Sequence, residues 1–348
     1  MIYRKQYYYD KFKCIDVKCP KSCCVGWQIM IDKDSLKKYQ NVTHAFADRL
    51  NSGINFQESY FYRYNERCSM LNDSGLCDLI STLGEDYLCD TCRLFPRHIE
   101  EFQDIREYSL TLACPEVTRI VMEPDYEFSI TESEDETFDD PEEFEEFDFL
   151  LFDQLEYARD KMFEIASDRQ KPLQERMDAI AFMAYKLQEC FDEGEIFSMG
   201  DVSDSIMEES KDRNLSFKYC MNALDELMNM EATEKSWTDT LINTQKYWNE
   251  HDENSKEWTE AMFPDSDIEF IFEKVLKTLL FTYFCGSVYD GQIYASAMIA
   301  VQSVRFMMMI NKASDEPLNK TIYIYSREIE HSYNNLNAFI RKFEEELD

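Results

Sequence analysis

The sequence predicts a mainly α-helical protein in which a cysteine-rich, metal-binding N-terminal region with little β-structure packs on a C-terminal multi-helix domain. Three observations support this fold class: the 348 residues include only eight Gly and eight Pro, 44% are hydrophobic, and nine of the twelve cysteines lie before residue 115. So few breakers favour long helices, and the apolar content suffices for a core. We expect a cysteine-rich region over residues 1–125, an acidic linker over 126–148 and a helical domain over 149–348.

The cysteine-rich region has short elements. Trp27 to Ile31 alternates weakly between apolar and polar residues, which predicts a strand. Glu107 to Ala113 alternates as well, and it is expected to pair with Ile99 to Asp104 as a hairpin. Residues 115–122 predict a helix with Pro115 at its first position, where proline is favoured.

An acidic block separates this region from the rest of the chain. Eleven of residues 131–148 are Asp or Glu, and no Lys or Arg occurs between Arg119 and Arg159. Such a block is usually solvated or a linker. Apolar residues at three- and four-residue gaps nevertheless predict that a long amphipathic helix begins inside it. They are Phe144, Phe147, Leu151, Leu155, Ala158, Met162 and Ile165.

The C-terminal part reads as successive helices. Pro172 is expected to open one and Gly194 to end it. Further helices are predicted near residues 202–210, 215–230, 234–250, 266–285, 291–311 and 322–346. We interpret the aromatic and Met residues at helical spacing as core and not as a ligand site.

The formal net charge is −34. This excess would repel nucleic acid and anionic membranes and would favour a cationic partner, such as a lysine-rich protein surface, although it also serves solubility alone. Residues 1–10 lack the apolar segment of a secretory signal. The uncharged stretch from Gly291 to Val304 is shorter than the roughly 20 residues of a membrane span. We therefore expect a cytoplasmic protein without nucleic-acid or membrane partners, in a compartment where disulfides are rare.

The nine N-terminal cysteines are candidate metal ligands. They are Cys14, Cys19, Cys23, Cys24, Cys68, Cys77, Cys89, Cys92 and Cys114. Four thiolates can surround one zinc ion or anchor a four-iron cluster. Nine cysteines allow three arrangements: one four-cysteine centre with spare thiols, two metal sites, or one centre with a redox pair. The isolated Cys190, Cys220 and Cys285 are expected to be core or surface thiols.

Several common signatures are missing. The CxxxCxxC triplet of radical S-adenosylmethionine enzymes is absent, because Gly26 stands where Cys19 and Cys23 would need a third cysteine. No Gly-x-Gly occurs, so the glycine-rich loop of an ordinary Rossmann methyltransferase is absent. The histidines form no H-x3-H or HExxH pair. His98 closely follows the CxxC motif and could be a ligand, but a surface histidine is the favoured interpretation, because no partner stands at ligand spacing.

The residues between the cysteines carry a more specific signal. The motifs are Cys19-Pro20-x2-Cys23-Cys24-x-Gly26-Trp27, Arg67-Cys68-x2-Leu71, Leu76-Cys77, Leu83-Gly84-Glu85-Asp86-x-Leu88-Cys89-x2-Cys92-Arg93-x-Phe95-Pro96-Arg97 and Cys114-Pro115-Glu116. This pattern, over roughly residues 12–120, resembles the flagellin lysine-N-methylase family, part of a wider group of CxxCxxCC proteins. The chain departs from that short name with a C-x4-C-x3-C-C spacing, which leaves open whether Cys14 or Cys19 matches the family ligand.

The resemblance implies an enzyme, a protein-lysine N-methyltransferase that transfers methyl groups from S-adenosylmethionine to lysine side chains of flagellin in the cytoplasm. It also implies a cysteine-bound [4Fe-4S] cluster, with zinc as the alternative metal. The donor's carboxylate needs a cation, which Arg93 or Arg97 could supply unless both pair with nearby carboxylates. The catalytic base is not assigned.

Two other functions remain open on the sequence. The first is a zinc-stabilised, non-enzymatic binding or adaptor module for a basic or helical protein. The second is a thiol redox sensor.

Overall fold

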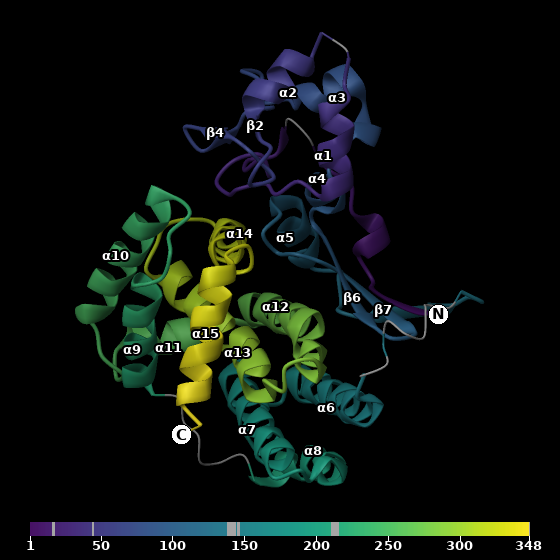
Figure 1. Cartoon of the computed structure of the whole chain (residues 1–348). Helices are drawn as coiled ribbons and strands as arrows, with labels where there is room; N and C mark the ends of the chain where they lie inside the picture. Colours follow the sequence, from purple (N-terminus) through teal and green to yellow (C-terminus); the bar gives the residue numbers. More distant parts are fainter. Residues whose placement is uncertain (16–17, 44, 138–143, 145–146, 210–215, 348) are drawn as a thin grey trace.

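A computed structural model of the chain shows two lobes of unequal size (Figure 1). The smaller one, here called the cysteine lobe, comprises residues 24–94 and has its own apolar core. The larger one, here called the body, contains a four-stranded sheet and the remaining helices around a second core. The structure describes residues 1–15, 18–43, 45–137, 144, 147–209 and 216–347.

The cysteine lobe consists of short helices and two-residue strands. They are α1 (Lys33–Gln40), α2 (Ala47–Gly53), β2 (Ile54–Asn55), β3 (Tyr60–Phe61), β4 (Arg63–Tyr64), β5 (Arg67–Cys68), α3 (Asp78–Leu83) and α4 (Asp90–Leu94). The strand predicted over Trp27 to Ile31 is wrong, because only Met30 forms a β-bridge there, with Tyr60. The alternation instead reflects the burial of Ile29 and Ile31 in the lobe's core.

The body's sheet has the order β6-β7-β1-β8. Its strands are β1 (Ile2–Gln6), β6 (Arg97–Phe102), β7 (Ile105–Leu110) and β8 (Ile130–Glu134). The predicted hairpin is confirmed as β6 and β7, while β1 pairs in parallel with β7 and antiparallel with β8. Part of the acidic segment predicted as a linker therefore forms an edge strand. Its side chains are mostly exposed, so it lacks the apolar alternation that would predict a strand.

Helices dominate the body and confirm the mainly α fold class. They are α5 (Pro115–Val121), α6 (Phe149–Ser167), α7 (Leu173–Asp192), α8 (Met199–Glu209), α9 (Phe217–Met228), α10 (Lys235–Asn249), α11 (Lys256–Met262), α12 (Ser266–Tyr283), α13 (Ile293–Lys312), α14 (Leu318–Ile329) and α15 (Tyr333–Glu345). The helix predicted at Pro115 is confirmed, as is the one that ends before Gly194.

The structure differs from the helix prediction in three places. Helix α6 begins at Phe149 and not within the acidic block, because the carboxylate of Asp148 caps it by accepting from the Leu151 N–H. Of the predicted start from Phe144 onward, residues 145–146 lie outside the described residues. The single helix predicted over 322–346 is two, since Ser332 caps a new helix, α15. The short helix α11 was not predicted.

Helix α13 is the centre of the body. It is the one helix of the described residues that is long and apolar enough to span a membrane, and 94% of its apolar window is buried inside the protein. Its Arg305 is fully buried and forms an ion pair of 2.6 Å with Asp178 of α7. Burial by neighbouring helices therefore accounts for the apolar character of α13.

A buried ion pair attaches the sheet to the helices. Arg159 of α6 forms two hydrogen bonds with the carboxylate of Glu107 on β7, at 2.5 and 2.6 Å, and each side chain is 2% exposed. Such a pair holds its position because either charge alone would be left unpaired in the interior. The sheet is consequently part of the body, and its strands β6 and β7 lead from the cysteine lobe into it (Figure 1).

Candidate functional site

Five cysteines come together in the cysteine lobe. They are Cys24, Cys68, Cys77, Cys89 and Cys92, here called the lobe set. Burial, together with the neighbouring Cys24 and Cys77, raises the pKa of the Cys68 thiol to about 12. A hydrogen bond from the Cys92 thiol to Cys89 raises the pKa of Cys92 and lowers that of Cys89. Cys24 and Cys68 also act electrostatically on Cys92, so these thiols share one region of the lobe.

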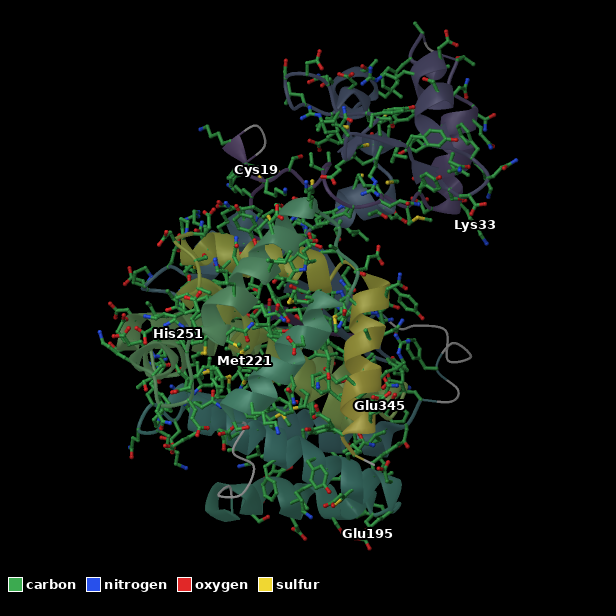
Figure 2. The ribbon with its side chains drawn as sticks, turned by 90° about the vertical axis from the view of Figure 1, so that its left-hand side faces the viewer. Cys19, Lys33, Glu195, Met221, His251 and Glu345 are labelled. Carbon is green, nitrogen blue, oxygen red and sulfur yellow. The ribbon has the colours of Figure 1, made fainter. Side chains whose placement is uncertain are left out.

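The other four cysteines gather where the lobe meets the body. They are Cys14, Cys19, Cys23 and Cys114, here called the junction set. Burial raises the pKa of Cys114 to about 11, with Cys19 and Cys14 as contributing neighbours. Cys23 donates a hydrogen bond to Cys24, which links the two sets. Figure 2 shows Cys19 above the body, well apart from Lys33 in the lobe.

Three of the nine thiols precede the first residue of a helix. Cys77, Cys89 and Cys114 occupy the N-cap positions of α3, α4 and α5. Burial raises the pKa of Cys77 and of Cys114, and backbone N–H groups of the following helical turn oppose that rise. Free N–H groups at a helix start favour a thiolate over a thiol. At Cys77 and Cys114 the helix starts therefore offset part of the burial that disfavours the anionic form of the sulfur.

The thiols are sufficient in number for a four-cysteine cluster. Within the described ranges, no three His, Cys, Asp or Glu side chains converge closely enough to chelate a single ion. In an iron-sulfur cubane each thiolate binds a different iron, so its ligands are spaced more widely than the four around one zinc. The lobe set offers five sulfurs for such an arrangement and the junction set four.

The two arginines predicted to bind a donor carboxylate lie in different settings. Arg93 is exposed and forms an ion pair with Asp90, three residues earlier in α4. Arg97 lies at the start of β6, with its guanidinium 5.9 Å from the ring centre of Tyr9 and 5.6 Å from that of Phe12.

A third arginine near the cysteines, Arg327, is not indicated by any sequence pattern. Arg327 of α14 is 3% exposed, and its Nη2 donates to the carbonyl oxygens of Ser22 and Val25 in the loop that carries Cys23 and Cys24. Its guanidinium lies 4.0 Å from the centre of the Trp27 ring. Nη1 is buried and forms no hydrogen bond with the part of the chain that the structure describes. No local pattern could have identified Arg327, because its partners lie about 300 positions earlier in the sequence.

Around Arg327, side chains of both lobes form a polar and aromatic cluster. We call it the junction site: Trp27, Phe95, Thr111, Tyr283, Arg327, Glu330 and His331. The His331 ring packs 4.6 Å from Trp27 and 5.6 Å from Phe95, although the residue as a whole is exposed. The site therefore reaches the surface at His331.

A carboxylate stands at the inner end of the junction site. Oε2 of Glu330 accepts hydrogen bonds from the Tyr283 hydroxyl at 2.8 Å and from the Thr111 hydroxyl at 3.2 Å. Burial raises the pKa of Glu330, and these hydrogen bonds, with one from Ser326, lower it in part. Thr111 also lies 3.4 Å from Nε2 of His331. Carboxylate, aromatic rings and an arginine together suit ligands that carry both a cation and an anion.

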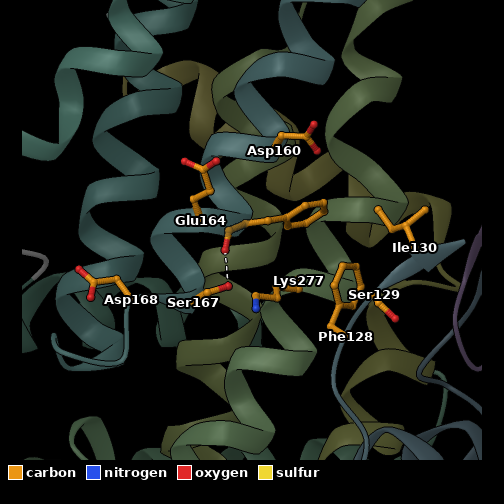
Figure 3. Close-up of a pocket in the computed structure, with 9 residues that line it drawn as sticks. Phe128, Ser129, Ile130, Asp160, Glu164, Ser167, Asp168 and Lys277 are labelled. Carbon is orange, nitrogen blue, oxygen red and sulfur yellow. Dashed lines mark hydrogen bonds between the residues drawn. The ribbon is translucent and has the colours of Figure 1, made fainter.

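A separate surface groove of about 610 Å³ lies between β8, α6 and α12 (Figure 3). Its lining includes Ser129, Asp160 and Lys277. Ser167 also lines it, and its hydroxyl donates a hydrogen bond of 2.6 Å to the carbonyl of Phe163. None of the nine cysteines or of the junction-site residues lines it. The groove is therefore distinct from the candidate site.

Sequence comparisons find lysine methylases. The protein is 34% identical over 126 residues to a lysine-N-methylase of Salmonella typhimurium, a match that covers 33% of this chain and 31% of the relative. It is 34% identical over 124 residues to the flagellar biosynthetic protein FliU of Salmonella muenchen, covering 33% of this chain and 73% of FliU. A lysine-N-methylase of Salmonella choleraesuis is 32% identical over 135 residues, with 33% and 31% covered.

The matched segment thus spans less than a third of the length of the two lysine-N-methylases. No solved structure matches the chain. A family model, described as the FliB lysine N-methylase C-terminal domain, matches residues 159–348, which is more than half of the chain and includes Arg327, Glu330 and His331. On this match, the protein belongs to the FliB lysine N-methylase family.

Proposed function

We propose that the protein is an S-adenosylmethionine-dependent protein-lysine N-methyltransferase that acts on flagellin. The observation that carries this proposal is family membership, together with relatives named lysine-N-methylase and flagellar biosynthetic protein. The net charge of −34 is consistent with a partner that presents lysine residues. We further propose that the reaction takes place in the cytoplasm, before flagellin is exported.

The junction site supplies the groups that this reaction needs. Methyl transfer brings together a cationic sulfonium and a lysine amine, and the rings of Trp27, Phe95 and Tyr283 suit cations. Nη1 of Arg327 is buried, has no hydrogen-bond partner among the described residues, and would pair with the donor's carboxylate. Arg93 and Arg97 are weaker candidates for that role, since Arg93 is paired with Asp90 and Arg97 packs on aromatic rings.

A [4Fe-4S] cluster is part of the proposal. Four of the five sulfurs of the lobe set would hold it, and a cluster of this kind supplies one-electron chemistry or a site for donor binding when bound. Cys24 links this set through Cys23 to the loop whose carbonyls bind Arg327. That loop would therefore hold the donor site and the cluster at a fixed position relative to each other.

The proposal is tested by anaerobic purification, iron and zinc analysis, and intact-mass measurement of flagellin after incubation with S-adenosylmethionine. We expect a brown protein with about four irons per chain, as a cubane requires, and flagellin heavier by whole methyl groups only when the donor is present. Arg327→Ala should raise the KM for the donor, while Arg341→Ala, at an exposed site on α15, should not.

One outcome favours the adaptor function instead. A colourless protein with a single zinc that binds flagellin tightly and leaves its mass unchanged would overturn the methyltransferase proposal.

A further inference from the structure

Glu330 directly follows the last residue of α14 and faces several elements at once. It receives the hydroxyl of Tyr283 from α12 and that of Thr111 from the segment after β7. His98 on β6 lies close enough to act on it electrostatically, but the His98 ring pairs with Glu100 at 2.7 Å. Arg327, one turn earlier on α14, directs Nη2 away to the carbonyls of Ser22 and Val25.

The carboxylate lacks a cation. Among the residues that the structure describes, no Lys, Arg or His forms an ion pair with Glu330. Its Oε1 is shielded from solvent and forms no hydrogen bond of normal geometry, although the Ser326 hydroxyl is near enough to influence its pKa. A shielded carboxylate with a free acceptor is costly unless a positive group completes it.

The surroundings indicate which cation would fit. The rings of Trp27, His331 and Phe95 pack together at tilted angles, and Nε2 of the exposed His331 lies 3.4 Å from the Thr111 hydroxyl that contacts Glu330. A long aliphatic chain that ends in an ammonium could lie along these rings and reach the carboxylate. A lysine side chain of a protein substrate has this form.

We infer that Glu330 binds the ammonium of the substrate lysine and accepts a proton from it. This inference rests on the proposed methyltransferase function. One N–H bond of the ammonium breaks and an O–H bond forms on Glu330, which leaves a neutral amine. The lone pair of that amine forms the new N–C bond with the methyl group as the C–S bond of the sulfonium donor breaks, and a neutral thioether leaves. Glu330 returns its proton to solvent before the next turnover.

The test compares methylation of flagellin by the full-length wild type and by Glu330→Gln over a range of pH. The amide keeps the size of the side chain and still accepts from Tyr283, but it cannot take a proton. We expect kcat to fall by about 10²- to 10⁴-fold, the usual contribution of a general base. The wild-type rate should rise with pH and reach a plateau as the carboxylate ionises. The residual rate of the variant should keep rising, because only ionisation of the lysine itself then supplies free amine.

Glu316→Gln is the matched control. Glu316 precedes the same helix, is exposed and pairs with Lys320 at 2.7 Å, so its loss should leave kcat and the pH profile unchanged. If Glu330→Gln does not fold, Glu330→Asp takes its place. That variant should keep the wild-type shape of the pH profile with a lower kcat, since the carboxylate is one methylene farther from the amine.

The outcomes separate the two proposals. A wild type that does not methylate flagellin overturns the proposed function itself. An active wild type whose Glu330→Gln variant folds and keeps both kcat and the pH plateau overturns the role of Glu330 alone. For Glu330→Asp, an unchanged kcat or a profile without a plateau would also overturn it.

Discussion

Replacing Gly26 by alanine should weaken the attachment of the loop with Cys23 and Cys24 to the body. Gly26 has a φ of +101°, and a Cβ at this position would lie 2.5 Å from Oε1 of Glu234, the residue before α10. Glu234 is 8% exposed and forms an ion pair of 2.5 Å with Lys21. Because the carboxylate can swing away, the cost is the loss of that charged hydrogen bond, about 1.5–3 kcal/mol, added to the strain of a left-handed alanine, about 1–2 kcal/mol.

Gly75→Ala is the matched control. Its φ is +79° and a Cβ there meets nothing within 4 Å, so it measures backbone strain alone. An unfolding entropy of about 2.1 cal/mol/K per residue gives roughly 0.7 kcal/mol/K for a chain of this length. We therefore expect Gly26→Ala to lower the melting temperature by about 2–4 °C more than Gly75→Ala does. Thermal denaturation of both variants, with limited proteolysis of the loop, provides the measurement.

Equal shifts of the two variants would refute the reasoning. They would mean that the approach of Gly26 to Glu234 contributes nothing to stability beyond the backbone conformation. The same result would remove the argument that this contact holds the loop with Cys23 and Cys24 against the body.

Three further predictions concern the buried groups and the thiols. Glu107→Gln leaves the charge of Arg159 unpaired in the interior and should cost about 3–5 kcal/mol of unfolding free energy. The control Glu132→Gln, at a side chain that is 59% exposed, should cost at most about 1 kcal/mol. Equal unfolding free energies of the two variants in chemical denaturation would contradict the stabilising role of the buried pair. Burial raises the pKa of Glu328 from 4.5 to about 7, so the folded state binds this proton more tightly, and its contribution to stability, present below pH 4.5, is lost as the pH rises through 7. Denaturation at pH 5 and pH 8 should therefore show a loss on the order of 3 kcal/mol in the wild type that Glu328→Gln lacks. Cys92→Ser should lower the iron content after anaerobic purification, while Cys220→Ser, at a buried site in α9, should not; equal iron in both would exclude Cys92 as a ligand.

The sequence predicted those elements whose signals are local. Helix α7 lies between Pro172 and Gly194 because proline at a helix start and glycine after its end act within one turn. The hairpin of β6 and β7 follows from alternation over adjacent segments. Strands β1 and β8 were missed because one lies at the chain start and the other is a solvated acidic edge strand; each is defined by a partner more than 100 residues away.

The candidate site, like the fold, has features that local sequence signals predict and features that only the tertiary structure shows. The nine clustered cysteines and the motifs between them were enough to predict a thiol-rich metal region, which stays a prediction. They also predicted a lysine methylase resemblance, and the family match confirms that resemblance. The grouping of the thiols into a lobe set and a junction set depends on distances between segments, and so it could not be obtained from spacing along the chain.

The sequence alone determined the helical fold class, the cysteine-rich region and the family, since composition, periodicity and short motifs are properties of neighbouring residues. The tertiary structure decided which groups meet at the junction site. Arg327 and Glu330 carry no motif, and they become distinctive only because the chain folds Ser22, Trp27 and Thr111 against α14. Their burial without full pairing arises from packing between distant segments, and burial is what turns an ordinary arginine and glutamate into candidate functional groups.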